Sequence, residues 1–137
     1  MSESSAQIND NDHAEARAAL EAVVQVYFDS MYESSADKVI EAFHPSAKIT
    51  GYMNSDELGE MTREQFAKFV ARQSPSPREK GEAAILEIVS LDVAGATAVA
   101  RVRDAYLGMM FLDTLSFVLE GDRWQIYNKL YHVEGSA

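Results

Sequence analysis

Cysteine is absent from the 137-residue sequence. Disulfide bonds, thiolate nucleophiles, zinc ribbons and iron–sulfur clusters are therefore excluded. The sequence has three histidines, and no two of them are separated by two or four positions, the spacings that bring paired metal ligands onto one face of a strand or helix. We therefore expect neither a metal site nor a cofactor.

Basic residues are also scarce: 12 lysines and arginines face 22 aspartates and glutamates, which gives a net charge of -10. Such a charge repels a polyanionic backbone, so a nucleic-acid partner is not expected. No apolar run approaches the ~18 residues that a membrane span needs. The first twelve residues are polar and acidic, unlike a secretory signal, and we expect a cytoplasmic protein.

What remains is the composition of an ordinary globular protein, with 47% hydrophobic and 25% charged residues. A chain of this length buries roughly two thirds of its surface on folding, so it needs no metal or disulfide for stability. We predict a single domain over residues 13–133, with flexible tails at 1–12 and 134–137.

Helical periodicity dominates the first part of the chain. It predicts a first helix from His13 to Tyr32 with Asp12 as N-cap. Apolar residues recur every three or four positions on one face of this helix: Ala16, Leu20, Val23, Tyr27 and Met31. Ser35 can cap a short second helix that ends before Pro45. The buried side of that helix is expected to comprise Val39, Ile40 and Phe43.

A third helix is predicted to begin at Arg63, because Thr62 and Gln65 have the spacing of a capping box. It is expected to direct Phe66, Phe69 and Val70 inward and to stop before the proline-containing loop at 74–77. A short hairpin over 48–61 should connect it to the second helix.

From Glu82 onward the periodicity is that of strands. Four runs are separated near Ala94–Gly95, Leu107–Gly108 and Glu120–Asp122, which predicts an antiparallel meander. Helices followed by consecutive strands are typical of α+β proteins. We expect three N-terminal helices packed on one face of a curved, mostly antiparallel sheet.

The last two strands have apolar residues on both faces. Strict alternation in the final strand places Trp124, Ile126, Asn128, Leu130 and His132 on one face. A sheet that only covered helices usually has one polar face, so a second molecule should cover the outer face. We expect a homodimer through an apolar patch formed by Leu112, Val118, Tyr127, Tyr131 and Val133.

This order of elements resembles the nuclear transport factor 2-like superfamily. The segments 42–49, 113–117 and 121–129 are most similar to its group named "putative lumazine-binding" or SnoaL-like. The resemblance covers roughly residues 14–133. It implies a cone-shaped domain whose open end admits a small molecule between the first helix and the sheet, and it says little about chemistry because such folds host many functions.

Matching the segments gives candidate residues for the inner face of the cone. The inner face is expected to carry Tyr27 and Met31 from the first helix, and Ile49 and Gly51 from the first strand. The candidate ligand-binding residues are Tyr27, Met31, Arg101, Arg103, Asp113, Leu115, Asn128 and His132. The two arginines would select the polar end of the ligand. The opposite orientation of their strand, with Ala100 and Val102 buried, would place both arginines on the outer face.

The known reactions of the superfamily are not expected here. Tyr27 matches the donor tyrosine of the steroid isomerases, but the base position falls on Gly51 and the second acid falls near Leu115. In the segment 101–104, an arginine occupies the position of the first aspartate of the related epoxide hydrolase. No complete acid–base set of either enzyme is present.

Three hypotheses follow. The first is a small-molecule-binding domain with a largely apolar, cone-shaped pocket. The alternative is an isomerase, lyase or hydrolase with a non-standard acid–base set. A third is a dimerisation unit with a collapsed pocket. The missing acid–base pairs favour binding, whereas a buried carboxyl group of raised pKa beside Tyr27 would favour catalysis.

Overall fold

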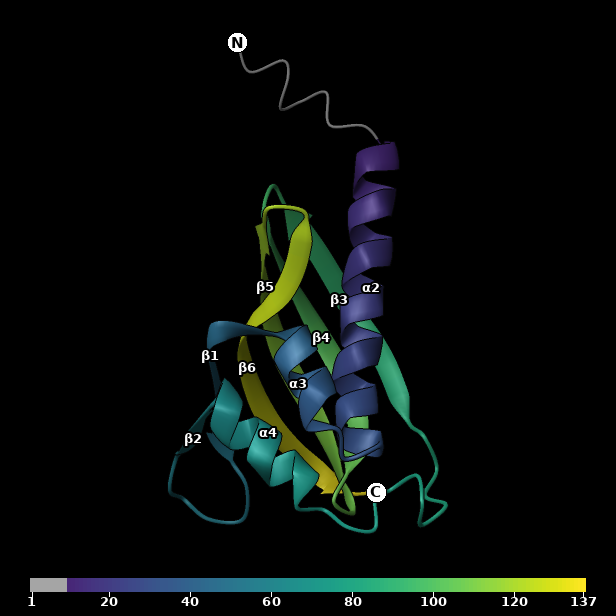
Figure 1. Ribbon diagram of the computed structural model, residues 1–137, viewed down its shortest axis with the longest axis vertical. Helices are drawn as coiled ribbons and strands as arrows, with labels where there is room; N and C mark the ends of the chain where they lie inside the picture. The colour runs from purple at the N-terminus through teal and green to yellow at the C-terminus, as the bar shows by residue number, and fades with distance from the viewer. Residues whose placement is uncertain (1–9) are drawn as a thin grey trace.

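Three helices cover the concave face of one six-stranded sheet (Figure 1). The computed structural model describes residues 10–137. The elements are α2 (Asp10–Tyr32), α3 (Ala36–Ala42), β1 (Phe43–Tyr52), β2 (Gly59–Thr62), α4 (Arg63–Ala71), β3 (Leu86–Ala94), β4 (Thr97–Tyr106), β5 (Met109–Glu120) and β6 (Arg123–Ser136). None of the described helices has the length and apolar character required to cross a membrane.

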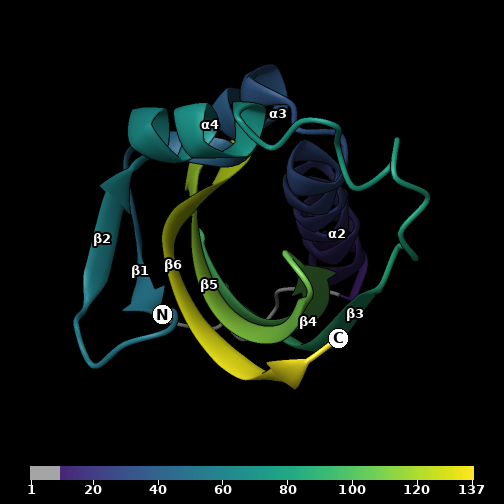
Figure 2. The same cartoon turned by 90° about the horizontal axis from the view of Figure 1, so that it is seen from below.

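The strand order is β2-β1-β6-β5-β4-β3. All neighbouring strands are antiparallel except β1 and β6, which run parallel. Seen from below, the sheet curls around the space that α2 occupies, and α3 and α4 close the opposite side (Figure 2). The predicted α+β architecture, with three helices on a curved and mostly antiparallel sheet, is confirmed.

Side-chain caps define the starts of α3 and α4 as predicted. The hydroxyl of Ser35 accepts a hydrogen bond from the backbone nitrogen of Lys38. Thr62 and Gln65 form the complete capping box, in which each side chain bonds the other residue's backbone nitrogen. The cap predicted at Asp12 is wrong, because α2 already includes Asp10. The rest of the predicted N-terminal tail, residues 1–9, lies outside the described residues.

The predicted buried side of α3 is confirmed at Val39 and is wrong at Ile40. Val39 and Ala42 are buried, whereas Ile40 is exposed. Phe43 is buried as expected, but it belongs to β1, because its backbone is already extended at the end of the helix. The second helix therefore connects to the first strand with no intervening loop.

The meander turns lie where the sequence predicted them. Gly95, Gly108 and Gly121 follow β3, β4 and β5, with φ angles of 61°, 75° and 60°. These positive values favour glycine, which has no Cβ to clash with the backbone. Strand β3 begins at Leu86 rather than at Glu82, and β6 continues to Ser136. The predicted domain end at residue 133 therefore falls within a strand.

A β-bulge at Tyr127 interrupts the alternation of β6. Phe117 of β5 pairs with Ile126, and the adjacent Ser116 pairs with Asn128, so Tyr127 is an extra residue on β6. An inserted residue exchanges the two faces of the strand beyond it. The strict alternation predicted for this strand is therefore wrong after Ile126.

Beyond the bulge, Lys129 and Tyr131 point toward the concave side, where Lys129 is buried and Tyr131 is half-buried. Asn128 and His132, predicted to point into the cone, are exposed on the outer face together with Leu130. Tyr131 and Val133 were expected in the outer apolar patch. Both instead pack against the core.

The predicted orientation of the arginines in β4 is also wrong, and the opposite orientation is the correct one. Arg101 is exposed, and Arg103 forms ion pairs with Glu134 at 2.8 Å and Glu87 at 3.2 Å on the outer face. The arginines point outward because burial of an unpaired guanidinium is costly. Apolar side chains occupy most of the inner positions of the strand. The buried residues of β4 are Ala98, Ala100, Val102, Asp104 and Tyr106.

Candidate ligand-binding cavity

A cavity of about 210 Å³ opens between the end of α2, helix α4 and the concave face of the sheet. Eight apolar side chains form most of its wall: Met31, Ile49, Met53, Met61, Phe66, Phe69, Leu107 and Phe111. Four residues with polar groups complete it: Asp104, Tyr106, Lys129 and Tyr131. Sites for drug-sized ligands usually measure ~300–1,000 Å³, so this cavity suits a smaller molecule.

A larger hollow of about 470 Å³ lies beside the first turns of α2. Its lining includes His13, Gly95 and Asp122, which are all exposed, and it is more open to solvent. The smaller cavity is the better candidate, because polar groups converge in it at the bottom of an apolar enclosure.

Lys129 reaches the cavity from β6 and is surrounded by aromatic rings. Its side-chain nitrogen lies 4.7 Å from the ring centres of Tyr27 and Phe66 and 5.7 Å from that of Tyr131. Only 6% of the residue is exposed, and no carboxylate lies within 4 Å of Nζ in residues 10–137. Ring faces attract a cation by up to ~2 kcal/mol when water is excluded, so they stabilise this ammonium without filling its hydrogen-bonding positions.

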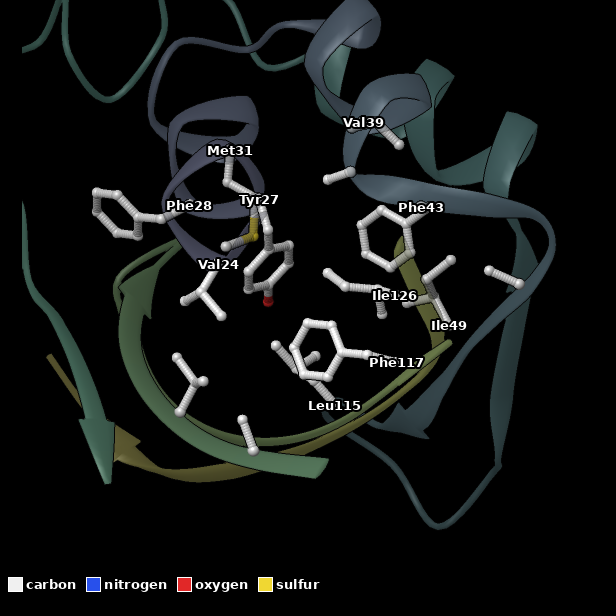
Figure 3. Close-up of a cluster of buried hydrophobic side chains, with 14 of the residues drawn as sticks. Val24, Tyr27, Phe28, Met31, Val39, Phe43, Ile49, Leu115, Phe117 and Ile126 are labelled. Carbon is white, nitrogen blue, oxygen red and sulfur yellow. The ribbon is translucent and has the colours of Figure 1, made fainter. Parts of the chain in front are cut away.

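Behind the cavity wall, Tyr27 of α2 contacts a carboxyl group on β5. Its hydroxyl donates a 2.6 Å hydrogen bond to Oδ2 of Asp113, and both residues are fully buried. Figure 3 shows the Tyr27 hydroxyl directed from the helix toward the sheet, above Leu115 and Phe117. This hydrogen bond ties α2 to the concave face at the centre of the core.

Asp104 is a second buried carboxyl group next to Asp113. Val102 pairs with Asp113 across β4 and β5, and Asp104 lies two residues further along the same face. Neither Oδ2 of Asp104 nor Oδ1 of Asp113 has a hydrogen-bond partner in the described chain when both groups are ionised. A proton on Asp104 satisfies both oxygens, because the acid can then donate to Asp113.

The electrostatics agree with that protonation. Burial, followed by the charge and the hydrogen-bonding of Asp113, raises the pKa of Asp104 well above its usual range, while Lys129 lowers it in part. Burial and the two carboxyl groups also raise the pKa of Tyr27 well above its usual value, so the phenol stays a donor. Asp104 is therefore the member of this cluster that favours the protonated form, with Asp113 and Tyr27 as its neighbours.

Tyr106 adds an unused polar group beside the cavity. Its hydroxyl is buried and has no hydrogen-bond partner in the described chain, and burial raises the pKa of the phenol. Buried hydroxyl groups usually have a partner. A ligand group that reached this hydroxyl would satisfy it.

The candidate residues predicted from the sequence occupy three different places. Met31 lines the cavity. Tyr27, Asp113 and Leu115 are buried in the core behind it. Tyr27 donates to Asp113, and its ring faces Nζ of the cavity-lining Lys129. The remaining four lie on the outer face and cannot contact a molecule in the cavity: Arg101, Arg103, Asn128 and His132.

Gly51 was matched to the position of the base in the steroid isomerases. The side chain of Tyr131 lies in the space that a base at position 51 would need. A Cβ atom on Gly51 would collide with the backbone oxygen of Tyr131, its partner in the β1–β6 pairing, and would lie 2.6 Å from Cδ1 of the tyrosine ring. The tyrosine ring thus fills the space that a larger residue at 51 would need. The carboxyl groups of this chain are instead on β4 and β5.

Metal coordination finds no support in residues 10–137, where no three histidine, aspartate or glutamate side chains are grouped closely enough to bind an ion. The polar groups that the cavity offers are two phenols, a carboxyl group and an ammonium. Together they can donate hydrogen bonds to a ligand and can exchange a proton with it.

The comparisons with known proteins identify the family. Residues 15–132 match the family described as "Putative lumazine-binding", and the chain belongs to that family. No match is found among curated proteins. The fold is that of nuclear transport factor 2-like proteins, as the sequence predicted.

Solved structures agree on the fold. An NTF2-like protein of unknown function from Silicibacter pomeroyi has a TM-score of 0.79 at 25% identity, over 89% of this chain and 98% of that one. One from Shewanella baltica has a TM-score of 0.79 at 22% identity, over 90% and 97%. One from Methylobacillus flagellatus has a TM-score of 0.77 at 21% identity, over 94% and 97%.

Proposed function

We propose that this domain binds a small, largely apolar molecule with one polar end in the cavity between α4 and the sheet. The observation that carries the proposal is the arrangement of the wall: eight apolar side chains enclose a space into which the polar groups converge. The hydroxyl of Tyr106, next to that space, has no partner in the described chain. Apolar enclosure with a few convergent polar groups is typical of ligand sites.

A thermal-shift screen of small metabolites tests this proposal. A ligand at about 100 times its dissociation constant adds ~2.7 kcal/mol to the free energy of unfolding. Met61→Trp should fill the cavity and abolish the shift. Val89→Trp, at an exposed position of the edge strand β3, should leave it unchanged. Hits that stabilise both variants equally would bind elsewhere and would contradict the proposal.

A second candidate function is proton-transfer catalysis by an isomerase, lyase or hydrolase with a non-standard acid–base set. The specific observation in its favour is the Asp104–Asp113 pair beside Tyr27, in which the pKa of Asp104 is raised by burial and by its neighbour. Carboxyl groups tuned in this way serve as general acids and bases. Asp104 is the member that lines the cavity and would contact a substrate.

Deuterium exchange distinguishes the two candidates. An isomerase or a lyase that removes a C–H proton should exchange the acidic C–H protons of a bound screening hit with D₂O, which NMR follows directly. Asp104→Asn should abolish the exchange and retain binding. A domain that only binds would protect those protons in both forms.

The outer sheet face is the proposed homodimer interface. The support is a group of apolar side chains that lie on the outer face once the bulge in β6 is taken into account, and Leu130 among them is 54% exposed. The group comprises Val99, Leu112, Val118, Tyr127 and Leu130. Exposed apolar patches of this kind mark interaction surfaces. Light scattering at tens of micromolar should give the mass of a dimer.

Leu130→Glu should reduce that mass to a monomer's, because a charge would have to be buried within the patch. Val89→Glu, at the bulge of the edge strand β3, should leave the dimer intact. A wild-type protein that is strictly monomeric would contradict this part of the proposal.

A further inference from the structure

Lys129 has donors that its surroundings do not use. The residue is only 6% exposed and reaches the cavity, yet its hydrogen-bond partner within the described chain is Sδ of Met31 at a distance of 4.0 Å. An ammonium group has three donors, and a thioether sulfur is a weak acceptor. A buried cation without strong acceptors is costly, so the site is poised for an oxygen acceptor supplied from the cavity.

The charges around Lys129 limit what that acceptor can be. Two carboxyl groups, those of Asp104 and Asp113, already lie on the inner face of the sheet, and the ammonium is the one basic group among the described residues that line the cavity. An anionic ligand would add an uncompensated charge to a buried, apolar site, and the whole protein already carries -10. A neutral acceptor adds no charge and still receives a charge-assisted hydrogen bond.

Geometry supports the same choice. The apolar wall contains three aromatic rings besides the tyrosines, from Phe66, Phe69 and Phe111, and the first of these also faces Nζ. A flat, apolar molecule placed against such a wall would extend one oxygen atom toward Lys129. The unpaired hydroxyl of Tyr106 borders the same cavity and offers a second donor.

We propose that Lys129 is the specificity-determining residue of the cavity and that it binds the carbonyl oxygen of a small, uncharged ketone, ester or related carbonyl compound. This inference rests on the proposed ligand-binding function and names its ligand class. The ammonium donates to the oxygen, while the apolar wall holds the rest of the molecule. No covalent step is part of the proposal.

Three probes on one aromatic frame test it: acetophenone, which carries a neutral carbonyl group; benzoate, which carries an anionic carboxylate; and cumene, which has the same heavy-atom skeleton as acetophenone without an acceptor. Dissociation constants are measured by NMR titration. Acetophenone should bind roughly tenfold to a hundredfold more tightly than cumene, the ratio expected for one hydrogen bond to a charged donor. Benzoate should bind more weakly than acetophenone.

Lys129→Met keeps an apolar side chain of similar length and removes the ammonium. This variant should lose most of the preference for acetophenone over cumene, with only the Tyr106 hydroxyl left as a donor. Arg103→Met removes a cation from the outer face and should retain the wild-type preference. If Lys129→Met does not fold, Lys129→Arg provides the second test, because it retains a cation with displaced donors and should reduce the preference.

Each contrary outcome has a distinct meaning. Equal binding of acetophenone and cumene by the wild type would overturn the carbonyl site and leave the binding cavity standing. Preferred binding of benzoate would replace it with an anion site. Failure of all three probes to bind would overturn both this inference and its basis in the proposed function.

Discussion

Replacement of Asp104 by asparagine should stabilise the protein at neutral pH. Burial and Asp113 raise the pKa of Asp104 in the folded state above the value near 3.9 expected for an unfolded aspartate. Between these two pKa values the unfolded chain releases the proton and the folded chain keeps it. The free energy of unfolding of the wild type therefore falls as the pH rises through this window.

The magnitude follows from linkage, at about 1.4 kcal/mol for each unit by which the pKa is raised. The asparagine side chain of the variant cannot titrate, and its amide can still donate to Asp113, so the variant should lose this pH dependence. The difference in unfolding free energy between variant and wild type should thus be small near pH 4. It should grow in favour of the variant as the pH rises and then level off above the raised pKa.

Urea unfolding from pH 4 to pH 8 measures that difference directly. Asp92→Asn is the matched control, because Asp92 is exposed on β3 and its replacement should not produce the rise. Asp113, Tyr27 and Lys129 face Asp104 and respond to its loss, so the curve reports the whole cluster. A difference that stays flat, or that decreases with pH, would refute the assignment of the proton.

Three further predictions concern the core and are all measured by urea unfolding. Phe66→Ala should lower the free energy of unfolding by about 3–5 kcal/mol, because Phe66 is almost fully buried. Phe69→Ala should lower it less, because Phe69 is half-buried at the cavity. Equal losses in the two variants would contradict the assigned helix face. Gly51→Ala should cost at least about 1–3 kcal/mol by forcing Tyr131 aside, and an unchanged stability would contradict that contact. Tyr27→Phe should cost about 1–3 kcal/mol by leaving a buried carboxylate oxygen without its donor, and no loss would contradict the hydrogen bond.

Local chemistry made most of the fold predictable. The capping box at Thr62, the cap at Ser35 and the glycine turns after β3, β4 and β5 depend on neighbouring residues, and each of them is confirmed. The family resemblance supplied the curvature of the sheet and the place of the cavity, neither of which is encoded locally.

The site was harder to predict, because it depends on strand parity. One extra residue at Tyr127 transfers Lys129 to the inner face and Asn128 to the outer face, and no residue type in that segment marks the bulge. In β4 the sequence did carry a signal. Once Val102 is placed inside, alternation places Asp104 inside as well, beside the aspartate at 113 that was already a candidate.

The central claim is that the cavity receives a ligand, and the methionine methyl groups measure this most directly. Met31, Met53 and Met61 line the cavity, whereas Met109 and Met110 lie at the start of β5 outside it. In a protein with ¹³C-labelled methionine methyl groups, titration with acetophenone should shift the three cavity signals and leave those of Met109 and Met110 in place. Shifts confined to Met109 and Met110, or no shift at all, would contradict the account.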